Sequence, residues 1–319
     1  MGAALVALLP VVPTVAVLVI VWSLAQLVVS IAQGPLLATV VDRVPENRIG
    51  VASAVTGLVA YFGSIGGSLL AGSLFAAIGL ASYFPVAIVL LLMTVSFVLF
   101  ARDRSSGALA VEPLRVRTFF GTYVRALADR DYRWAWIAKM LLYIGYGIVT
   151  VYGLYMLQSY VTPALSVTQA AQTAPLVQFA SLPGALIGML FSGRWSDKVG
   201  RRKPFVIAAS IIMAVSFLIP LAWPTVAAMF AASIVSGLGM GVFIVVDQAL
   251  FIDLLPHRES AGRDLGVSTV GGNLGLAIGP ALAGMVVVVS GGDYGPVWPV
   301  AFVVVLIAAF AVLPIKRVR

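Results

Sequence analysis

The stretch that decides the fold is a short polar loop: Gly193-Arg-Trp-Ser-Asp197-Lys-Val-Gly200-Arg201-Arg202-Lys203. An apolar run at 172–192 precedes this loop, and a second apolar run at 204–222 follows it. An apolar stretch of about 18 or more residues is long enough to cross a bilayer as an α-helix. The loop and its flanks therefore predict two membrane-spanning helices that are joined at one face of a membrane.

Long apolar runs alternate with short polar loops over all 319 residues. Apolar residues make up 61% of the chain and charged residues only 10%, against about 25% charged residues in an ordinary soluble domain. This composition excludes a soluble globular domain, and also a disordered chain, which needs low hydrophobicity and high charge. We predict an all-α integral membrane protein with nine spans, preceded by a shorter apolar stub at Gly2 to Leu9. The predicted spans are 14–41, 50–76, 81–101, 134–160, 172–192, 204–222, 225–251, 263–289 and 296–314.

The basic residues indicate how these spans are oriented. Of the 20 lysines and arginines, 19 lie in alternate loops, at the adjoining helix starts or in the C-terminal tail, and the twentieth is Lys139. Cytoplasmic loops of membrane proteins carry an excess of Lys and Arg. We therefore expect a multi-pass protein of the cell membrane with a cytoplasmic C-terminus. The cytoplasmic segments are expected at 42–49, 102–133, 193–203, 252–262 and after 314.

The composition also limits the chemistry of the chain. It contains no cysteine and a single histidine, so thiolate metal sites and Ser-His-Asp triads have almost no side chains available. We expect no metal and no cofactor, and we do not expect an enzyme, because no nucleophile–base pair or phosphate-binding loop is present. The net charge of +8 follows from the excess of basic residues in cytoplasmic loops, so no nucleic-acid partner is expected.

The two halves of the chain resemble one another at a nearly constant spacing. Three short stretches recur 214, 211 and 212 residues later, and agreement between three anchors predicts an internal repeat. The pairs are Phe84-Pro-Val-Ala-Ile-Val with Trp298-Pro-Val-Ala-Phe-Val, Asp42-Arg-Val-Pro with Asp253-Leu-Leu-Pro, and Ala71-Gly with Ala283-Gly.

The second copy of the repeat is complete, with six spans, whereas the first shows only its last three spans and the stub. We expect an incomplete N-terminal bundle at 1–101, a central cytoplasmic linker at 102–133 and a complete C-terminal bundle at 134–319. Within the linker, 116–129 has the pattern of an amphipathic helix on the cytoplasmic face. The period predicts that the DNA upstream of the start codon encodes about 105 further residues, and that the 319-residue chain does not transport alone.

The quoted loop resembles the cytoplasmic signature of the major facilitator superfamily, G-x-L-A-D-R-x-G-R-K. The matching positions are Gly193, Asp197, Gly200, Arg201 and Arg202, while Trp195 and Ser196 replace the usual Leu and Ala. The loop follows two spans of the complete repeat, where the family places its second copy. The resemblance implies two pseudo-symmetric six-helix bundles. It also implies a monomeric secondary transporter that moves a small solute across the lipid bilayer by alternating access.

The resemblance implies a gate at the signature. In the family this carboxylate contacts a helix of the opposite half, so Asp197 is expected to favour the positive end of that helix dipole. Arg201 and Arg202 are then expected to pair with Asp42 or Glu46. Such contacts would hold the cytoplasmic side closed. The alternative is a solvated basic loop that only follows the positive-inside rule.

Family members bind their solute between the halves, near the middle of the membrane. Here this implies three cavity-lining helices, at 14–41, 134–160 and 225–251. Four polar residues of the first share one face at about 100° per residue, which indicates either a cavity lining or hydrogen bonds between helices. The candidates on the three helices are Ser23, Gln26, Ser30, Gln33, Lys139, Tyr143, Tyr146, Ser236 and Gln248.

Asp247 is the only carboxylate well inside a predicted span. Its counterpart in the first repeat is Leu36, so a symmetric structural role does not explain it. An acid inside a span is a candidate proton or ion carrier, and the alternative is a gate-side or structural ion pair with Lys139. Because Lys139 lies about one turn inside the membrane, we expect its ammonium group to extend to the interface.

Three functions compete. The run at 200–205 and Val246-Asp-Gln-Ala-Leu250, followed by Asp253, are similar to the proton-coupled glycoside and sucrose-type carriers. This similarity favours sugar symport, with protons as the coupling ion. The rivals are efflux of a lipophilic compound and a non-transporting, truncated remnant. The family's antiporter signature requires a Gly-Pro in the span at 50–76, and this span contains no proline.

Overall fold

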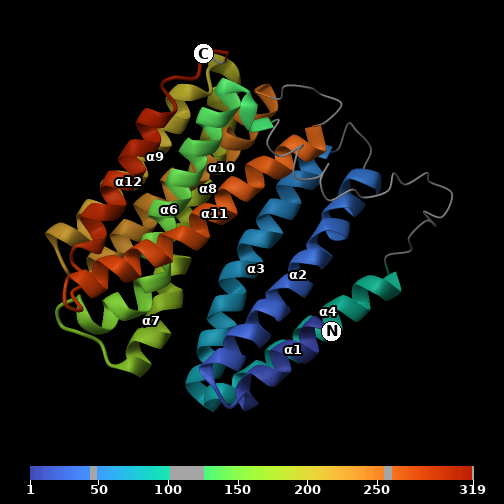
Figure 1. The fold of residues 1–319 in the computed structure, drawn as a ribbon, viewed down its shortest axis with the longest axis vertical. Coiled ribbons are helices and arrows are strands. Elements are labelled where there is room, and N and C mark those ends of the chain that lie inside the picture. Colours follow the sequence, from blue (N-terminus) through green and yellow to red (C-terminus); the bar gives the residue numbers. More distant parts are fainter. Residues whose placement is uncertain (44–48, 101–125, 255–260, 318–319) are drawn as a thin grey trace. The chain divides into compact units, whose positions relative to one another are not determined.

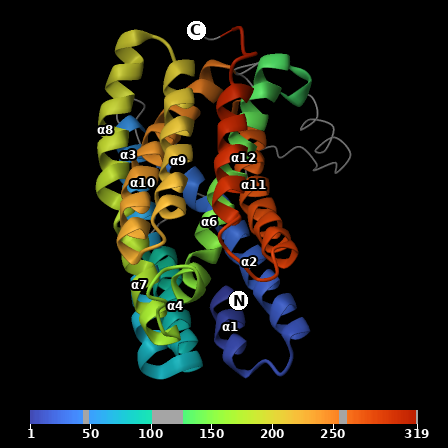
Figure 2. The same cartoon turned by 90° about the vertical axis from the view of Figure 1, so that its left-hand side faces the viewer.

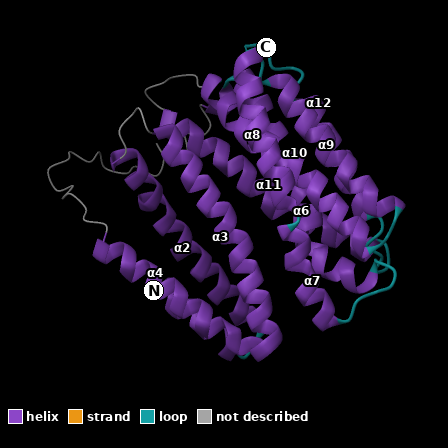
Figure 3. Ribbon diagram, turned by 180° about the vertical axis from the view of Figure 1, so that it is seen from behind, coloured by secondary structure: helices purple, strands orange, loops and turns teal. Residues whose placement is uncertain are grey.

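The structure, a computed structural model, describes residues 1–43, 49–100, 126–254 and 261–317. In these ranges every regular element is a helix and no strand is present (Figure 3). The chain divides into two units, Met1–Val111 and Glu112–Arg319, and each unit is described by itself. The all-α fold predicted from the sequence is confirmed.

The first unit contains the stub and three long helices. The stub is α1 (Gly2–Leu8), which continues into a 3-10 turn at Leu9–Val11. The long helices are α2 (Val15–Arg43), α3 (Ile49–Ile78) and α4 (Tyr83–Phe100), with a 3-10 turn at Gly79–Ser82 between the last two. Since α1 packs against both α2 and α4, the predicted stub is a packed helix of this unit.

The second unit is a helical bundle (Figure 1, Figure 2). They are α6 (Arg130–Ser159), α7 (Val167–Phe179), α8 (Ser181–Val199), α9 (Lys203–Ala222), α10 (Val226–Asp253), α11 (Ala261–Val289) and α12 (Val297–Ala311). In this bundle α10 packs against α8 and α9, α11 packs along α6, and α12 packs against α6 and α9.

The predicted spans correspond to helices with one correction. The span predicted at 172–192 consists of two helices, α7 and α8, which are separated at Ala180. The first helix begins earlier than predicted because Ser166 and Gln169 form a capping box at its start. Pro183 lies in the first turn of the second helix, where its missing N–H leaves no helix hydrogen bond unmade. The run also contains polar residues and two prolines, and Gln178, Ser181 and Pro183 lie beside the break.

The described part of the predicted linker, residues 126–133, belongs to the second unit. The carboxylate of Asp129 accepts hydrogen bonds from the backbone N–H groups of Asp131 (3.1 Å) and Tyr132 (3.0 Å). This N-cap makes α6 begin at Arg130, before the predicted start of the span. Most of the predicted amphipathic helix at 116–129 lies outside the described residues.

Large apolar side chains cover the outside of the second unit. Leu190, Val288, Val289 and Phe310 are each between 59% and 87% exposed, which is unfavourable in water but suits a lipid environment. Within the described residues, six helical segments are long and apolar enough to cross a membrane. They are Phe62–Phe100, Arg130–Ser159, Val167–Gly193, Lys203–Ala222, Val226–Asp253 and Gly266–Val289, and shorter apolar helices lie at Gly2–Val11, Val15–Ile31 and Val297–Ala311.

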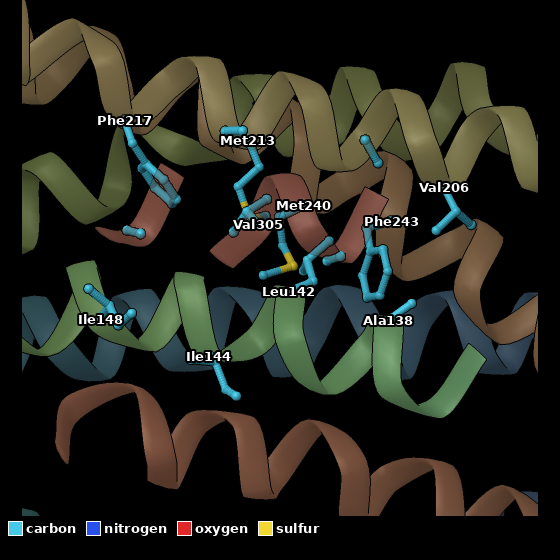
Figure 4. Packing of buried hydrophobic residues seen from close by; sticks show 14 of the residues in the cluster. Ala138, Leu142, Ile144, Ile148, Val206, Met213, Phe217, Met240, Phe243 and Val305 are labelled. Carbon is cyan, nitrogen blue, oxygen red and sulfur yellow. The ribbon is translucent and has the colours of Figure 1, made fainter. Parts of the chain in front are cut away.

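The interior of the second unit forms where α6, α9, α10 and α12 meet (Figure 4). Leu142, Met213, Met240 and Val305 lie together there, and the first three are at most 6% exposed. Where α8 meets α10, a Cβ added to Gly241 would collide with the backbone carbonyl of Ala185. Small residues at such contacts let two helix backbones approach closely, which is how helices in lipid gain packing energy.

The helices repeat at the offsets found in the sequence. The start of α10 lies 211 residues after the start of α2. The starts of α11 and α12 lie 212 and 214 residues after those of α3 and α4. Because the sequence anchors have the same three spacings, the internal repeat is a repeat of whole helices.

Candidate functional site

A buried ion pair lies inside the second unit. The ammonium group of Lys139 on α6 donates to Oδ2 of Asp247 on α10 over 2.7 Å. The same group donates to the hydroxyl of Ser268 on α11 over 2.9 Å. The side chains of Lys139 and Asp247 are only 14% and 7% exposed, and Ser268 is buried. One cation therefore links three helices of the bundle.

This geometry contradicts the expectation that Lys139 extends to the interface, and it shows the ion pair that was considered for Asp247. Lys139 does not extend to the membrane interface, as its position near the end of the span had suggested, because its ammonium group turns inward to Asp247. The ion pair with Lys139 was the alternative given for Asp247. A lysine that finds an anion and a hydroxyl within 3 Å has little to gain from extending its stem to water.

Aromatic rings surround the pair. The ammonium nitrogen of Lys139 lies 5.0 Å from the centre of the Phe251 ring, within the range of a cation–π contact. On the same face of α6, Tyr143 meets Phe243 of α10 edge to face, with ring centres 5.9 Å apart. Trp136 donates its indole N–H to the carbonyl of Val267 over 2.9 Å. The cluster is thus a polar centre enclosed by rings from α6 and α10.

Glycines on α11 make room for the cluster. A Cβ added to Gly272 would lie 3.4 Å from both the Lys139 stem and the Tyr143 ring. A Cβ added to Gly275 would lie 2.5 Å from the carbonyl oxygen of Met140. A larger side chain at either position would push α11 away from α6, and Ser268 would move away from Lys139 with it.

A paired charge in a membrane interior is expensive to separate, and this determines what the site can do. Removing one member of a buried pair typically costs several kcal/mol, because the other charge is left uncompensated. A proton on Asp247 would neutralise the anion and release the ammonium group of Lys139. The arrangement can therefore hold α6 and α10 together in one protonation state and free them in the other.

The signature loop has the predicted turn. Gly200 follows α8 with φ of 63°, in the left-handed region that favours glycine, and its N–H donates to the carbonyl of Ser196 over 2.9 Å. A Cβ added to Gly193 would lie 3.4 Å from Val245 of α10. Arg201 is exposed, and the side chain of Asp197 lies outside the described set. Residues 193–199 of the predicted loop are thus the end of α8, packed against α10, and only residues 200–202 join α8 to α9.

Arg202 has two partners inside its own bundle. Its guanidinium donates to the hydroxyl of Ser196 over 2.7 Å and lies 3.4 Å from Oδ2 of Asp253, at the end of α10. The sequence had suggested pairing with Asp42 or Glu46 of the first bundle, and both of these side chains lie outside the described part of the chain. The contact that the structure shows links the signature loop to α10.

The other cavity candidates lie on α2 of the first unit and on α6 and α10 of the second. Ser23, Gln26 and Ser30 are exposed on α2, and the side chain of Gln33 is not among those described. The hydroxyl of Ser236 donates to the carbonyl of Ser233 on its own helix over 3.1 Å, and Gln248 is exposed beside Asp247. Tyr146 is half-buried on α6. Of the predicted site residues in the second unit, the structure assembles Lys139, Tyr143 and Asp247 into one cluster.

The sequence analysis missed three members of the cluster: Trp136, Phe251 and Ser268. Ser268 carried a usable signal, since it is a hydroxyl in the apolar run at 263–289. The two aromatic residues carried none, because aromatic side chains are common in any membrane helix.

A family model describing the Major Facilitator Superfamily matches residues 136–317, more than half of the chain. The chain belongs to the major facilitator superfamily. It is therefore a multi-pass membrane protein of a family of transporters, which gives no support to an enzymatic role.

Two curated relatives of this facilitator chain are named as transporters. A gentisate transporter of Corynebacterium glutamicum is 30% identical over 198 residues, which cover 62% of this chain and 41% of that protein. The MFS-type transporter gkaD of Penicillium citrinum is 32% identical over 114 residues, or 35% of this chain and 18% of that protein. The chain thus spans less than half the length of these relatives.

A solved structure shares the fold of this facilitator chain. The E. coli fucose:proton symporter FucP matches with a TM-score of 0.57 and 15% sequence identity, over 97% of this chain and 82% of that one. At this identity the match is one of fold. It agrees with the two-bundle architecture implied by the signature and the repeat.

Proposed function

We propose that the protein to which this chain belongs is a secondary active transporter of a small solute, working as a monomer by alternating access in the cell membrane. The observation that carries the proposal is the buried Lys139–Asp247 pair, because it joins two helices that line the cavity in this family. The segregation of basic residues supports a cytoplasmic C-terminus.

We further propose that Asp247 couples transport to protons. In the paired state Lys139 holds α6 against α10, and Ser268 holds the lysine in place. Proton binding to Asp247 breaks the pair, so the two helices become free to separate. This places the coupling step at the only acidic side chain well inside a predicted span.

Two substrate classes are candidates. Sugar symport rests on the sequence similarity at 200–205 and 246–253 to glycoside and sucrose-type carriers. A small organic anion is the second candidate, because a 30% identical relative is named for gentisate, a carboxylate. Lys139 is the one cation well inside a described span, and it lies among aromatic rings that suit such a solute. The alternative to uptake of either solute is transport in the opposite direction, as efflux of a lipophilic compound.

Uptake into liposomes tests these proposals. The 319-residue chain, and the product read from any upstream in-frame start, are reconstituted and given an inward proton gradient with labelled gentisate or fucose. We expect gradient-driven accumulation of one solute. Asp247→Asn should abolish accumulation while leaving exchange of that solute, and Asp293→Asn, in the loop before α12, is the matched control.

The possible results of the uptake assay distinguish between these proposals. Full accumulation in Asp247→Asn would remove this acid from coupling. Export of a lipophilic dye with uptake of neither solute would favour efflux. Movement of no solute by either form of the protein would contradict transport. Uptake by the extended product alone would mean that the short chain is the non-transporting form.

A further inference from the structure

The segment that follows α12 is fastened to the rest of the second unit. It consists of residues 312–317 and is called the C-terminal strap here. Its apolar side chains Val312 and Ile315 are at most 1% exposed, although the segment has left the helix. Figure 2 shows it in red at the same end of the bundle as the start of α6, in green.

The lysine that directly follows the signature holds one side of the strap. Lys203, the first residue of α9, donates from its ammonium group to the carbonyls of Leu313 (3.0 Å) and Ile315 (2.6 Å). The last carbonyls of a helix and of the turn that follows it have no partner within the helix, and a cation there is favourable. Lys203 therefore links the start of α9 to the turn that follows α12, by satisfying two of its carbonyl groups.

The start of α6 holds the other side. Asp131, a carboxylate that is only 8% exposed, accepts hydrogen bonds from the backbone N–H groups of Lys316 (3.1 Å) and Arg317 (2.7 Å). The guanidinium of Arg317 also pairs with Asp129 over 2.6 Å. Since Asp129 is the N-cap of α6, the strap is joined to the turn through which the central linker enters the bundle.

We infer that the C-terminal strap is a clasp that locks the starts of α6 and α9 to the end of α12. Two charges, Lys203 and Asp131, bind backbone groups of the strap from opposite sides. If the strap left the bundle, Lys203 and Asp131 would both lose their backbone hydrogen bonds. The two sets of contacts therefore hold the whole strap in place together. The clasp makes this end of the bundle move as one body, with the linker and the tail joined to it.

The clasp gives Lys203 a task other than a gate between bundles. Arg202 turns to Asp253 and Lys203 turns to the strap, and both contacts lie inside the second unit. The last residue of the signature, Arg202, and the lysine that follows it thus each contact their own bundle. This conclusion does not depend on the substrate or on proton coupling.

Cysteine labelling tests the clasp directly, because the chain contains no cysteine. Ile315→Cys and Lys316→Cys are made singly in the otherwise native chain and treated with a water-soluble maleimide. Position 315 is buried and position 316 exposed, so we expect slow reaction at 315 and fast reaction at 316. Release of the strap should expose 315 without changing 316.

Two variants release the strap from opposite sides. Lys203→Met keeps most of the side chain and removes the charge, and Asp131→Ala removes the acceptor. Either change should raise the labelling rate of Ile315→Cys by about tenfold or more, because reaction at a buried site follows the population of the opened state. Lys198→Met, an exposed lysine in the same loop, should leave that rate unchanged.

Equal labelling rates at 315 and 316 in the otherwise native chain would overturn the inference. So would slow labelling at 315 that persists in both Lys203→Met and Asp131→Ala. Elution as a single species and an unchanged helical spectrum show that each variant has folded. Should Asp131→Ala fail to fold, Lys203→Met carries the test, because its substitution lies at the edge of α9 and leaves no buried acid without its hydrogen bonds.

Discussion

Replacing Asp247 by asparagine leaves the ammonium group of Lys139 inside the bundle without its anion. The pair is 2.7 Å apart, with 14% and 7% of the two side chains exposed, so water compensates little of the lost interaction. Breaking a buried pair typically costs about 3–5 kcal/mol. Because Lys139 keeps Ser268 at 2.9 Å and the Phe251 ring at 5.0 Å, we expect a loss of unfolding free energy near the lower end, about 3 kcal/mol.

The double variant determines whether the loss comes from the pair. Lys139→Met with Asp247→Asn removes both charges, and replacing a buried ion pair by uncharged residues is often close to neutral. We therefore expect the double variant to be more stable than either single variant, with a coupling energy of about 2 kcal/mol or more. Unfolding in mixed micelles with increasing dodecyl sulfate, followed by circular dichroism, measures all four proteins.

The opposite result would refute this reasoning. If the double variant loses as much free energy as the two single variants together, the two charges do not stabilise one another in the folded bundle. Ser268→Ala serves as a scale for the same assay, since it removes one hydrogen bond to the cation and should cost about 1–3 kcal/mol.

Three further results are expected. Gly184→Ala should destabilise the bundle, because a Cβ there collides with the Ile234 carbonyl of α10, whereas Gly153→Ala, with nothing within 4 Å, should gain up to about 1 kcal/mol; equal effects in thermal unfolding would contradict the packing. Burial raises the pKa of Asp129, but the Tyr132 N–H and Arg317 outweigh burial and lower the pKa below 3.8. Its stabilising contribution is therefore present above the unfolded-state pKa and is lost as pH falls through the lower folded value, and Asp129→Asn should flatten that loss in an acid titration of stability. Asp197→Asn should keep the fold but increase labelling at single cysteines introduced on the cytoplasmic side, and unchanged labelling would remove Asp197 from the gate.

Much of this protein follows from local rules that act on the sequence alone. The apolar runs had to become helices, because a backbone inside lipid must satisfy its own hydrogen bonds. The repeat offsets of 211, 212 and 214 recur in the helix starts, since each anchor lies at or near a helix end. The turn at Gly200 was also readable, because its left-handed backbone favours glycine.

Other features were decided only where helices meet. The direction of the Lys139 side chain depends on Asp247 and Ser268, more than a hundred residues away. The strap likewise joins Asp131 to the backbone of Arg317, 186 residues apart. The hydropathy and charge of a segment indicate whether it lies in lipid or in water, and so they predict spans and loops. Which charge faces which depends on the packing of several helices at once, and the tertiary structure alone determines it.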